Sequence, residues 1–299
     1  MRTLWILLLM LWLPAGAGLA AGAEKVSGAA VFLDEGMGAR WLGMGGAASA
    51  AAWDSSAAYW NPAGLTKQGP VVWQVGMTLS ASTLGRTSSA LSGSYLTDRA
   101  GTWGLAWMRS SVSGLESVDD TGNITGRDSD TADTLLVSWA RPVLYQVRVG
   151  GTVKFIREQL FGFSAAGLAG DAGILLQPFV EREFYLAGTI RNAAGMYEWS
   201  TGRSDQLARA FGVGAALKLW KDRILLAADA ISRDGVPVEV SAGAEVWALP
   251  ELALRAGWGR GSPAGGATYL WRPYELDYAF IWDRDDLGNS HRFSLLLHF

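Results

Sequence analysis

The sequence contains two histidines, and both lie near its C-terminal end. His291 follows an acidic stretch with Asp283, Asp285 and Asp286, so a hydrolytic site that pairs a histidine with carboxylates is one chemistry to consider. Spacing alone does not bring these side chains together, and a solvated acidic loop explains the stretch more simply. A calcium loop is disfavoured because Leu287 occupies a position that needs an oxygen ligand. We therefore expect no enzyme, no metal site and no cofactor.

A second candidate site is the glycine-rich segment at residues 36–65. Its first three residues begin like a dinucleotide-binding fingerprint, but Trp41 stands where the third glycine belongs, and the segment has no lysine for a phosphate loop. Nucleotide binding is therefore disfavoured. The alanines predict one or two turns of helix that end at Asn61, because the residue before Pro62 is pushed out of the helical region. The segment is better explained as a compact, apolar insert.

Charged residues at the centre of otherwise apolar segments form a third group. We expect their side chains to share one face in a confined space, where charges of both signs pair with one another. The group comprises Arg148, Lys154, Asp171, Arg191, Lys218, Asp229, Glu239, Glu245, Arg255, Asp277 and Arg292. Structural pairing is one interpretation. A polar path whose charges set the selectivity of a pore is the other.

Apolar and polar residues alternate around these charges, and this alternation indicates which elements position them. In "VEVSAGAEVW", Val238 and Val240 fall on one face while Glu239 and Glu245 fall on the other. Successive side chains of a β-strand point to opposite faces, so this pattern predicts a strand. We count fourteen such segments from residue 71 to the C-terminus. Their connections are expected to alternate between short turns and longer loops, such as those at 114–130 and 192–206.

The composition narrows the class of protein. Residues 1–23 have a basic start, an apolar run of about ten residues and a small-residue end, which indicates a cleaved signal peptide, since a bilayer is about 30 Å thick. Without them, 24 basic residues stand against 28 acidic ones, so nucleic acid is not an expected partner. The chain has no cysteine, which excludes disulfides and thiolate sites.

An exported chain with 15 tryptophans and no long apolar run after the signal can cross a membrane only as a closed β-barrel. Every backbone N–H and C=O group in a bilayer must find its partner within the protein. Tryptophans near the ends of the expected strands match the aromatic girdles of such barrels. The fold class predicted is therefore all-β, a transmembrane antiparallel barrel of about 14 strands in the bacterial outer membrane, in contact with its lipid.

The last nine residues, "HRFSLLLHF", predict the closing strand of this barrel. One face of that strand carries Phe293, Leu295, Leu297 and Phe299, and Phe299 is the final residue. An amphipathic strand with a terminal aromatic residue is similar to the signal that barrel-assembly machinery recognises. We interpret these four residues as a barrel-assembly signal.

A barrel of this size needs something inside it, because about eight strands are already as many as its own side chains can fill. We expect residues 24–66 to fold inward as a plug, ahead of the barrel at residues 67–299. The positions expected to shape the plug are Gly43, Gly45, Gly46, Asp54, Asn61, Pro62 and Gly64. Cysteines placed at Ala51 and Ala63 should then be shielded from solvent.

The stretch "GARWLGMGGAASAAAWDSSAAYWNPAGL" resembles the N-terminal signature of the PorV/PorQ family, which is related to the long-chain fatty-acid transporters of the FadL type. In that family a glycine-rich segment leads to an Asn-Pro-Ala motif, which Asn61, Pro62 and Ala63 match. Further likenesses are "GGTVKFI", "GDAGILL", "IRNAAG", "LRAGW" and "LDYAFIW". The resemblance covers most of the chain after the signal and implies a fourteen-stranded barrel with an N-terminal hatch.

The resemblance implies two functions. FadL-type members admit hydrophobic molecules through the hatch, whereas PorV-type members carry secreted proteins to a surface-attachment complex. The leading expectation is passive passage or binding of a hydrophobic small molecule. The alternative is an adaptor in protein secretion, whose partners would be secretion machinery or its cargo proteins.

Overall fold

The computed structural model describes residues 29–67, 72–82, 85–97, 99–118, 120–282 and 289–299. The expected signal peptide, the start of the expected plug and the acidic stretch that precedes His291 lie outside these residues. In the described part of the chain, no helix has the length and hydropathy needed to cross a membrane.

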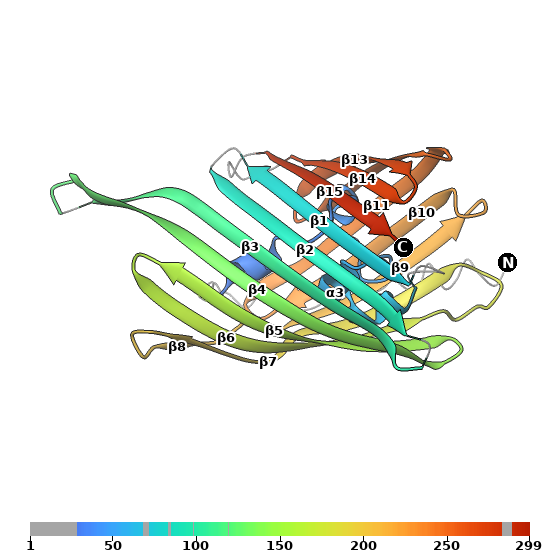
Figure 1. The fold of residues 1–299 in the computed structure, drawn as a ribbon, viewed down its shortest axis with the longest axis horizontal. Helices are drawn as coiled ribbons and strands as arrows, with labels where there is room; N and C mark the ends of the chain where they lie inside the picture. Colours follow the sequence, from blue (N-terminus) through green and yellow to red (C-terminus); the bar gives the residue numbers. More distant parts are fainter. Residues whose placement is uncertain (1–28, 68–71, 83–84, 98, 119, 283–288) are drawn as a thin grey trace.

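Fourteen antiparallel strands close into a barrel (Figure 1). Neighbours in sequence pair with each other, the first strand pairs with the last, and β6 pairs with β7, so the sheet has no free edge. The barrel strands are β1 (Trp73–Ser82), β2 (Arg86–Thr97), β3 (Gly101–Val118), β4 (Ile124–Leu144), β5 (Val147–Leu160), β6 (Phe163–Leu176), β7 (Phe184–Trp199), β9 (Ala210–Leu219), β10 (Ile224–Arg233), β11 (Val236–Leu249), β12 (Leu252–Gly259), β13 (Ser262–Trp271), β14 (Tyr274–Ile281) and β15 (Ser290–His298). The predicted fold class is confirmed.

Alternation sorts the side chains as expected. On β11, Val238 and Val240 are both 62% exposed on the outer wall, while Glu245 is buried inside. The closing strand turns Phe293 and Phe299 outward, and its alternate residue Leu296 is buried. Leu295 and Leu297 share the outer face of this strand. The barrel therefore has an apolar outer wall and a largely polar inner one.

We name the two ends of the barrel by their connections. The turn end holds the C-terminus, the connections from β2 to β3 and from β6 to β7, and the short turns at 145–146, 220–223, 250–251 and 272–273. The loop end holds the remaining connections between barrel strands, among which those at 161–162, 234–235 and 260–261 are also short. The expected alternation of short and long connections is therefore only partly present.

The loop predicted at 114–130 is wrong. β3 and β4 remain paired well beyond the ends of their neighbours and turn at Gly122, whose φ of +84° is a glycine conformation. Figure 1 shows this two-stranded ribbon extending past the barrel. The segment at 192–206 is likewise strand in part, since β7 continues to Trp199 and pairs with the short β8 (Ser204–Asp205). Both faces of such ribbons meet solvent, so their sequences lack the apolar alternation that indicates a strand.

Residues 29–67 lie inside the barrel (Figure 1). This N-terminal segment contains η1 (Val31–Asp34), α2 (Ala39–Gly43), α3 (Ala57–Trp60) and η2 (Pro62–Lys67). Ala29 pairs with Leu207 near the loop end, and η2 leads to the start of β1 at the turn end. The segment therefore runs through the barrel along its length.

Candidate functional site

Small residues let the N-terminal segment approach the barrel wall closely. A Cβ added to Gly259 on β12 would lie 1.8 Å from the carbonyl oxygen of Gly45, and one added to Gly45 would lie 2.5 Å from the backbone of Trp258. Gly45 also has a φ of +71°. A second close contact joins η2 to β5, where a Cβ on Gly150 would meet the backbone of Pro62 at 2.5 Å. Backbone thus packs against backbone, which no larger residue would allow.

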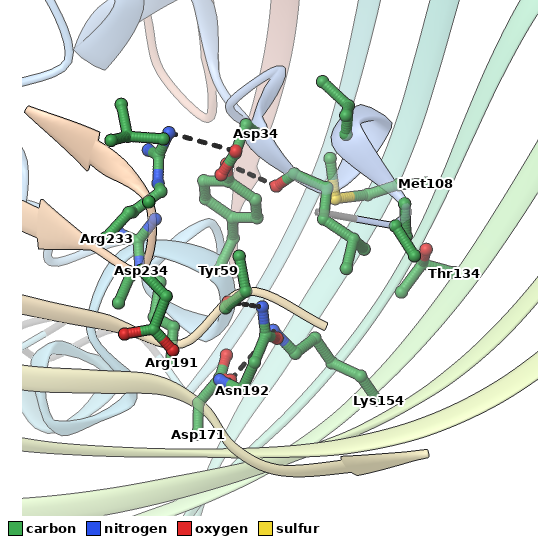
Figure 2. A pocket seen from close by; sticks show the side chains of 18 of the residues that line it. Asp34, Tyr59, Met108, Thr134, Lys154, Asp171, Arg191, Asn192, Arg233 and Asp234 are labelled. Atoms are coloured by element: carbon green, nitrogen blue, oxygen red, sulfur yellow. Dashed lines mark hydrogen bonds and ion pairs between the residues drawn. The ribbon is translucent and has the colours of Figure 1, made fainter. Parts of the chain in front are cut away.

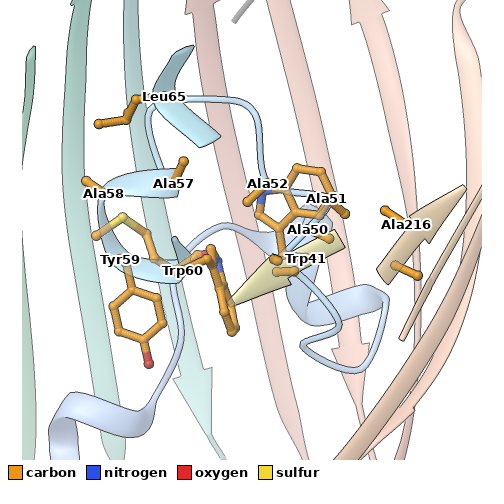
Figure 3. Close-up of a cluster of buried hydrophobic side chains, with 14 of the residues drawn as sticks. Trp41, Ala50, Ala51, Ala52, Ala57, Ala58, Tyr59, Trp60, Leu65 and Ala216 are labelled. Atoms are coloured by element: carbon orange, nitrogen blue, oxygen red, sulfur yellow. The ribbon is translucent and has the colours of Figure 1, made fainter. Parts of the chain in front are cut away.

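Two more of the glycines named from the sequence, Gly43 and Gly64, also sit at tight contacts. A Cβ on Gly43 would lie 2.9 Å from the side chain of Arg255, and one on Gly64 would lie 2.2 Å from the carbonyl oxygen of Ala52. Gly46 has a φ of +81° and faces the ring of Trp60. Around them, alanines and aromatic rings form one buried apolar cluster, shown in Figure 3.

Asn61 joins the segment to the wall through its side-chain amide. Its Nδ2 donates to the carbonyl oxygens of Ser49 (2.8 Å) and of Ile174 on β6 (3.2 Å). Its Oδ1 accepts from the backbone N–H of Ala63 at 3.1 Å. The side chain is fully buried, and both of its N–H donors and its oxygen bind the segment or the wall.

Asp54 acts within the segment. Its carboxylate accepts hydrogen bonds from the indole N–H of Trp41 at 2.9 Å and from the backbone N–H of Ser56 at 2.8 Å. Burial raises the pKa of Asp54 above its usual value, because the charged form loses its contact with water.

Arg40, which the sequence reasoning missed, links the segment to the buried charges of the wall. Its guanidinium donates to both carboxylate oxygens of Glu245, at 2.6 and 3.0 Å, and to Glu275 at 3.3 Å. Glu275 in turn lies 3.1 Å from Nε2 of His298. The available signal was that Arg40 is the one charged residue between Glu35 and Asp54.

Other predicted charges meet the same network. Arg255 lies 3.3 Å from Glu245 and 3.0 Å from Asp277. Asp229 on β10 accepts hydrogen bonds from the backbone N–H groups of Ala48 (3.0 Å) and Ser49 (2.8 Å). The wall therefore binds the segment through charge-assisted hydrogen bonds from the neighbouring strands β10 and β11 and from β14.

Three further predicted charges stand apart from this network. Lys218 lies near the turn end, with its Nζ 4.4 Å from the ring centroid of Trp53. Arg292 donates to Ser88 at 2.7 Å. Nη1 of Arg148 is buried and has no hydrogen-bond partner among the described residues.

A cavity of about 480 Å³ lies toward the loop end, between η1, the inner wall and the turn from β10 to β11 (Figure 2). Its apolar lining includes Leu33, Tyr59, Met108, Leu136 and Val236. Most of these side chains come from distant parts of the chain, and no sequence pattern indicated that they would meet.

The polar part of this cavity lies on β5 to β7. Nζ of Lys154 is 2.8 Å from Asp171 and donates to Oδ1 of Asn192 at 2.6 Å. Arg191 lies beside the pair, 9% exposed, and donates to the carbonyl oxygen of Trp60 at 3.1 Å. No carboxylate among the described residues lies within ion-pair distance of Arg191. The cavity therefore combines apolar surface with one buried cation that has no ion-pair partner there.

η1 closes the loop-end side of the cavity through ion pairs. Asp34 lies 3.1 Å from Arg233, and its carbonyl oxygen accepts a hydrogen bond from Arg260 at 2.7 Å. Glu35 accepts from Ser110 at 2.6 Å and lies 3.7 Å from Arg86. Three strands of the wall, β2, β3 and β10, and the turn between β12 and β13 thus hold η1 and the residue after it in place.

The described residues contain no cluster of three or more His, Cys, Asp or Glu side chains suited to a metal ion. His291 lies on the outer wall, where Nδ1 is 2.9 Å from the hydroxyl of Tyr278. His298 lies on the inner face, against Glu275.

No family model and no curated sequence matches the chain. Solved structures do. The toluene transporter TodX of Pseudomonas putida aligns with a TM-score of 0.61 at 14% identity, over 88% of this chain and 96% of its own. The CymD monoaromatic hydrocarbon channel gives 0.61 at 14% (88% and 98%), and a FadL homologue of Pseudomonas aeruginosa gives 0.58 at 13% (88% and 98%). The chain therefore has the barrel fold of these channels.

Proposed function

We propose that the protein is an outer-membrane barrel that binds a hydrophobic small molecule in the loop-end cavity and lets it pass without an energy source. The observation that carries this proposal is the cavity itself. Its volume of about 480 Å³ is within the range of about 300–1,000 Å³ usual for small-molecule sites. Its lining is mostly apolar, and proteins of the same fold are a toluene transporter and a monoaromatic hydrocarbon channel.

The N-terminal segment is the plug of this barrel in our proposal. It fills the lumen between the cavity and the turn end, and its contacts leave no room for larger side chains at Gly45 or Gly259. Expected residues 24–28 of the plug are part of the same proposal, as is removal of residues 1–23 during export. The buried charges of the wall then serve mainly to hold the plug, because Arg40 and the backbone of Ser49 use them as partners.

Native mass spectrometry of the protein, gently extracted from its own outer membrane, tests the proposal. We expect a co-purifying apolar molecule that added toluene or a fatty acid displaces. The variant Ala210→Phe places a ring where Ala210 lines the cavity, so the adduct should be lost. Val213→Phe, on the outer face of the same strand, is the matched control and should keep it. Retention of the adduct by Ala210→Phe would place the ligand elsewhere.

A PorV-like adaptor is the second candidate, and the ribbon of β3 and β4 favours it. Beyond the pairs Arg86–Val112 and Thr131–Gln159, this ribbon has neither β2 nor β5 beside it. It therefore offers both of its edges to another protein at the loop end. A stoichiometric protein partner in the same extraction, lost when residues 115–128 are deleted, would support the adaptor over the channel.

A further inference from the structure

Two arginines face outward at one level of the outer wall, on β3 and β5, with β4 between them. Arg109 on β3 pairs in register with Asp133 on β4, which pairs in register with Arg157 on β5. All three side chains point away from the lumen, because the residues on either side of each along its strand are buried or, in the case of Met108, line the cavity inside the barrel. We call these three residues the boundary row.

The boundary row marks the edge of the apolar band. The next outward row toward the turn end is apolar on five strands, and it consists of Leu91, Trp107, Leu135, Phe155 and Leu168. The next outward row toward the loop end is polar, and it consists of Thr87, Ser111, Thr131, Gln159 and Ser164. The change from apolar to polar surface therefore falls at the boundary row.

The length of the strand agrees with this position. Arg157 follows Val147, the first residue of β5, by ten residues. At a rise of about 3.3 Å per residue and a tilt of about 35–45°, that spacing is roughly 23–27 Å along the barrel axis. The apolar band of outer-membrane barrels is about 25 Å tall. Arg157 thus lies at the height where lipid head groups begin, and there an outward charge is tolerated.

The charges of the boundary row do not balance. Asp133 accepts two hydrogen bonds from Arg109, both at 2.8 Å, and one from the indole of Trp107 at 3.0 Å. All three of these hydrogen bonds go to Arg109 and Trp107, and none goes to Arg157. Arg157 is exposed and has no ion-pair partner among the described residues. The N–H donors of Arg157 therefore make no hydrogen bond to the described residues. The same holds for Nη1 of Arg109, since only Nε and Nη2 of that residue bind Asp133.

We propose that the boundary row binds the phosphate of a membrane lipid head group in the leaflet at the loop end, with Arg157 as its principal contact. A guanidinium group can donate two parallel hydrogen bonds to the oxygens of one phosphate, and it remains charged at all relevant pH values. The lipid tails would lie over the apolar row that includes Trp107 and Phe155. The three strands span about 10 Å at a spacing of about 4.8 Å per strand, so Arg109 and Arg157 can both reach one head group.

The test counts lipid adducts by native mass spectrometry on the purified barrel in detergent with added phosphatidylglycerol. Arg157→Gln removes the free cation and leaves no carboxylate unpaired, so it is the cleanest variant. We expect an apparent affinity about fivefold weaker, since each arginine near a membrane surface contributes on the order of 1 kcal/mol. Arg109→Gln/Arg157→Gln should be weaker again. Circular dichroism checks that each variant keeps its strand signal.

The matched control is Arg127→Gln, which removes an exposed arginine of the ribbon, beyond the pairing of β4 with β5. It should bind phosphatidylglycerol like the wild type. Equal loss in Arg127→Gln and Arg157→Gln would mean general charge attraction and would overturn the proposal, as would unchanged binding by Arg157→Gln. Displacement of the lipid by inorganic phosphate would show a free-anion site instead. Diacylglycerol, which has the tails without the phosphate, should bind wild type and variants alike.

Discussion

Arg40 donates to two carboxylates of the inner wall, Glu245 and Glu275, which are 1% and 4% exposed. A buried ion pair is a poor measure of stability as long as it is intact, because both ions lose their hydration. Removing one partner is different, since the other charge stays buried without compensation. The contribution of Arg40 therefore shows only when that residue is replaced.

We expect Arg40→Met to destabilise the barrel by about 3–5 kcal/mol, because Glu245 and Glu275 lose their shared cation. Denaturant unfolding in detergent measures the change. Arg209→Met is the matched control, since Arg209 and Asp234 form an ion pair in which both side chains are more than half exposed. Such pairs contribute about 0–1 kcal/mol. Equal losses in the two variants would mean that Arg40 does not anchor the segment.

The sequence could show that Glu245 and Arg255 share an inner face, because alternation fixes the face of every strand residue. Their pairing with each other agrees with the expectation that the inner charges pair. The sequence could not show that Glu245 also binds Arg40, which is 205 positions away in the chain. Contacts across a closed lumen depend on how the N-terminal segment folds, and no local pattern records that.

At the scale of elements, glycine on both sides of a contact sets how closely the N-terminal segment lies against the wall. Strand glycines normally weaken a strand, because they lose more conformational entropy and have no side chain to pack. Gly259 lies at a point of the wall where a methyl group would overlap the carbonyl oxygen of Gly45. Strand boundaries, in contrast, followed from alternation except in the ribbon of β3 and β4 and at the end of β7, which continues to Trp199.

We expect Gly259→Ala to force the segment away from β12 at a loss of about 1–3 kcal/mol, the usual result of overpacking. Gly170→Ala is the control, since a Cβ there meets nothing within 4 Å. Thermal unfolding in detergent should therefore separate the two variants, with Gly170→Ala close to wild type. A wild-type midpoint for Gly259→Ala would show that the segment shifts freely.

At the scale of the whole molecule, the fold and the outer wall could be predicted from the sequence, whereas the cavity could not. A barrel of fourteen strands follows from alternation, even strand number and the requirement that each backbone group be paired. The cavity exists because η1 and the inner wall leave space at the loop end while alanines fill the rest. The cavity is the space that remains between η1 and the inner wall, so its volume depends on where both lie in the folded chain.

A packed lumen predicts that the barrel is closed to water between the cavity and the turn end. Ala51 and Ala63 are fully buried there, and the chain has no cysteine of its own. We expect cysteines at Ala51 and Ala63 to resist a water-soluble maleimide in the folded protein, while one at the exposed Thr201 reacts within minutes. In planar bilayers the same protein should show no steady ion conductance, because ions need a continuous water path.

Arg40→Met should raise labelling at Ala51, since it frees the segment from β11 and β14. Rapid labelling of both buried cysteines in the otherwise unchanged chain would mean that the N-terminal segment leaves the lumen, and the proposed plug would then be a mobile hatch.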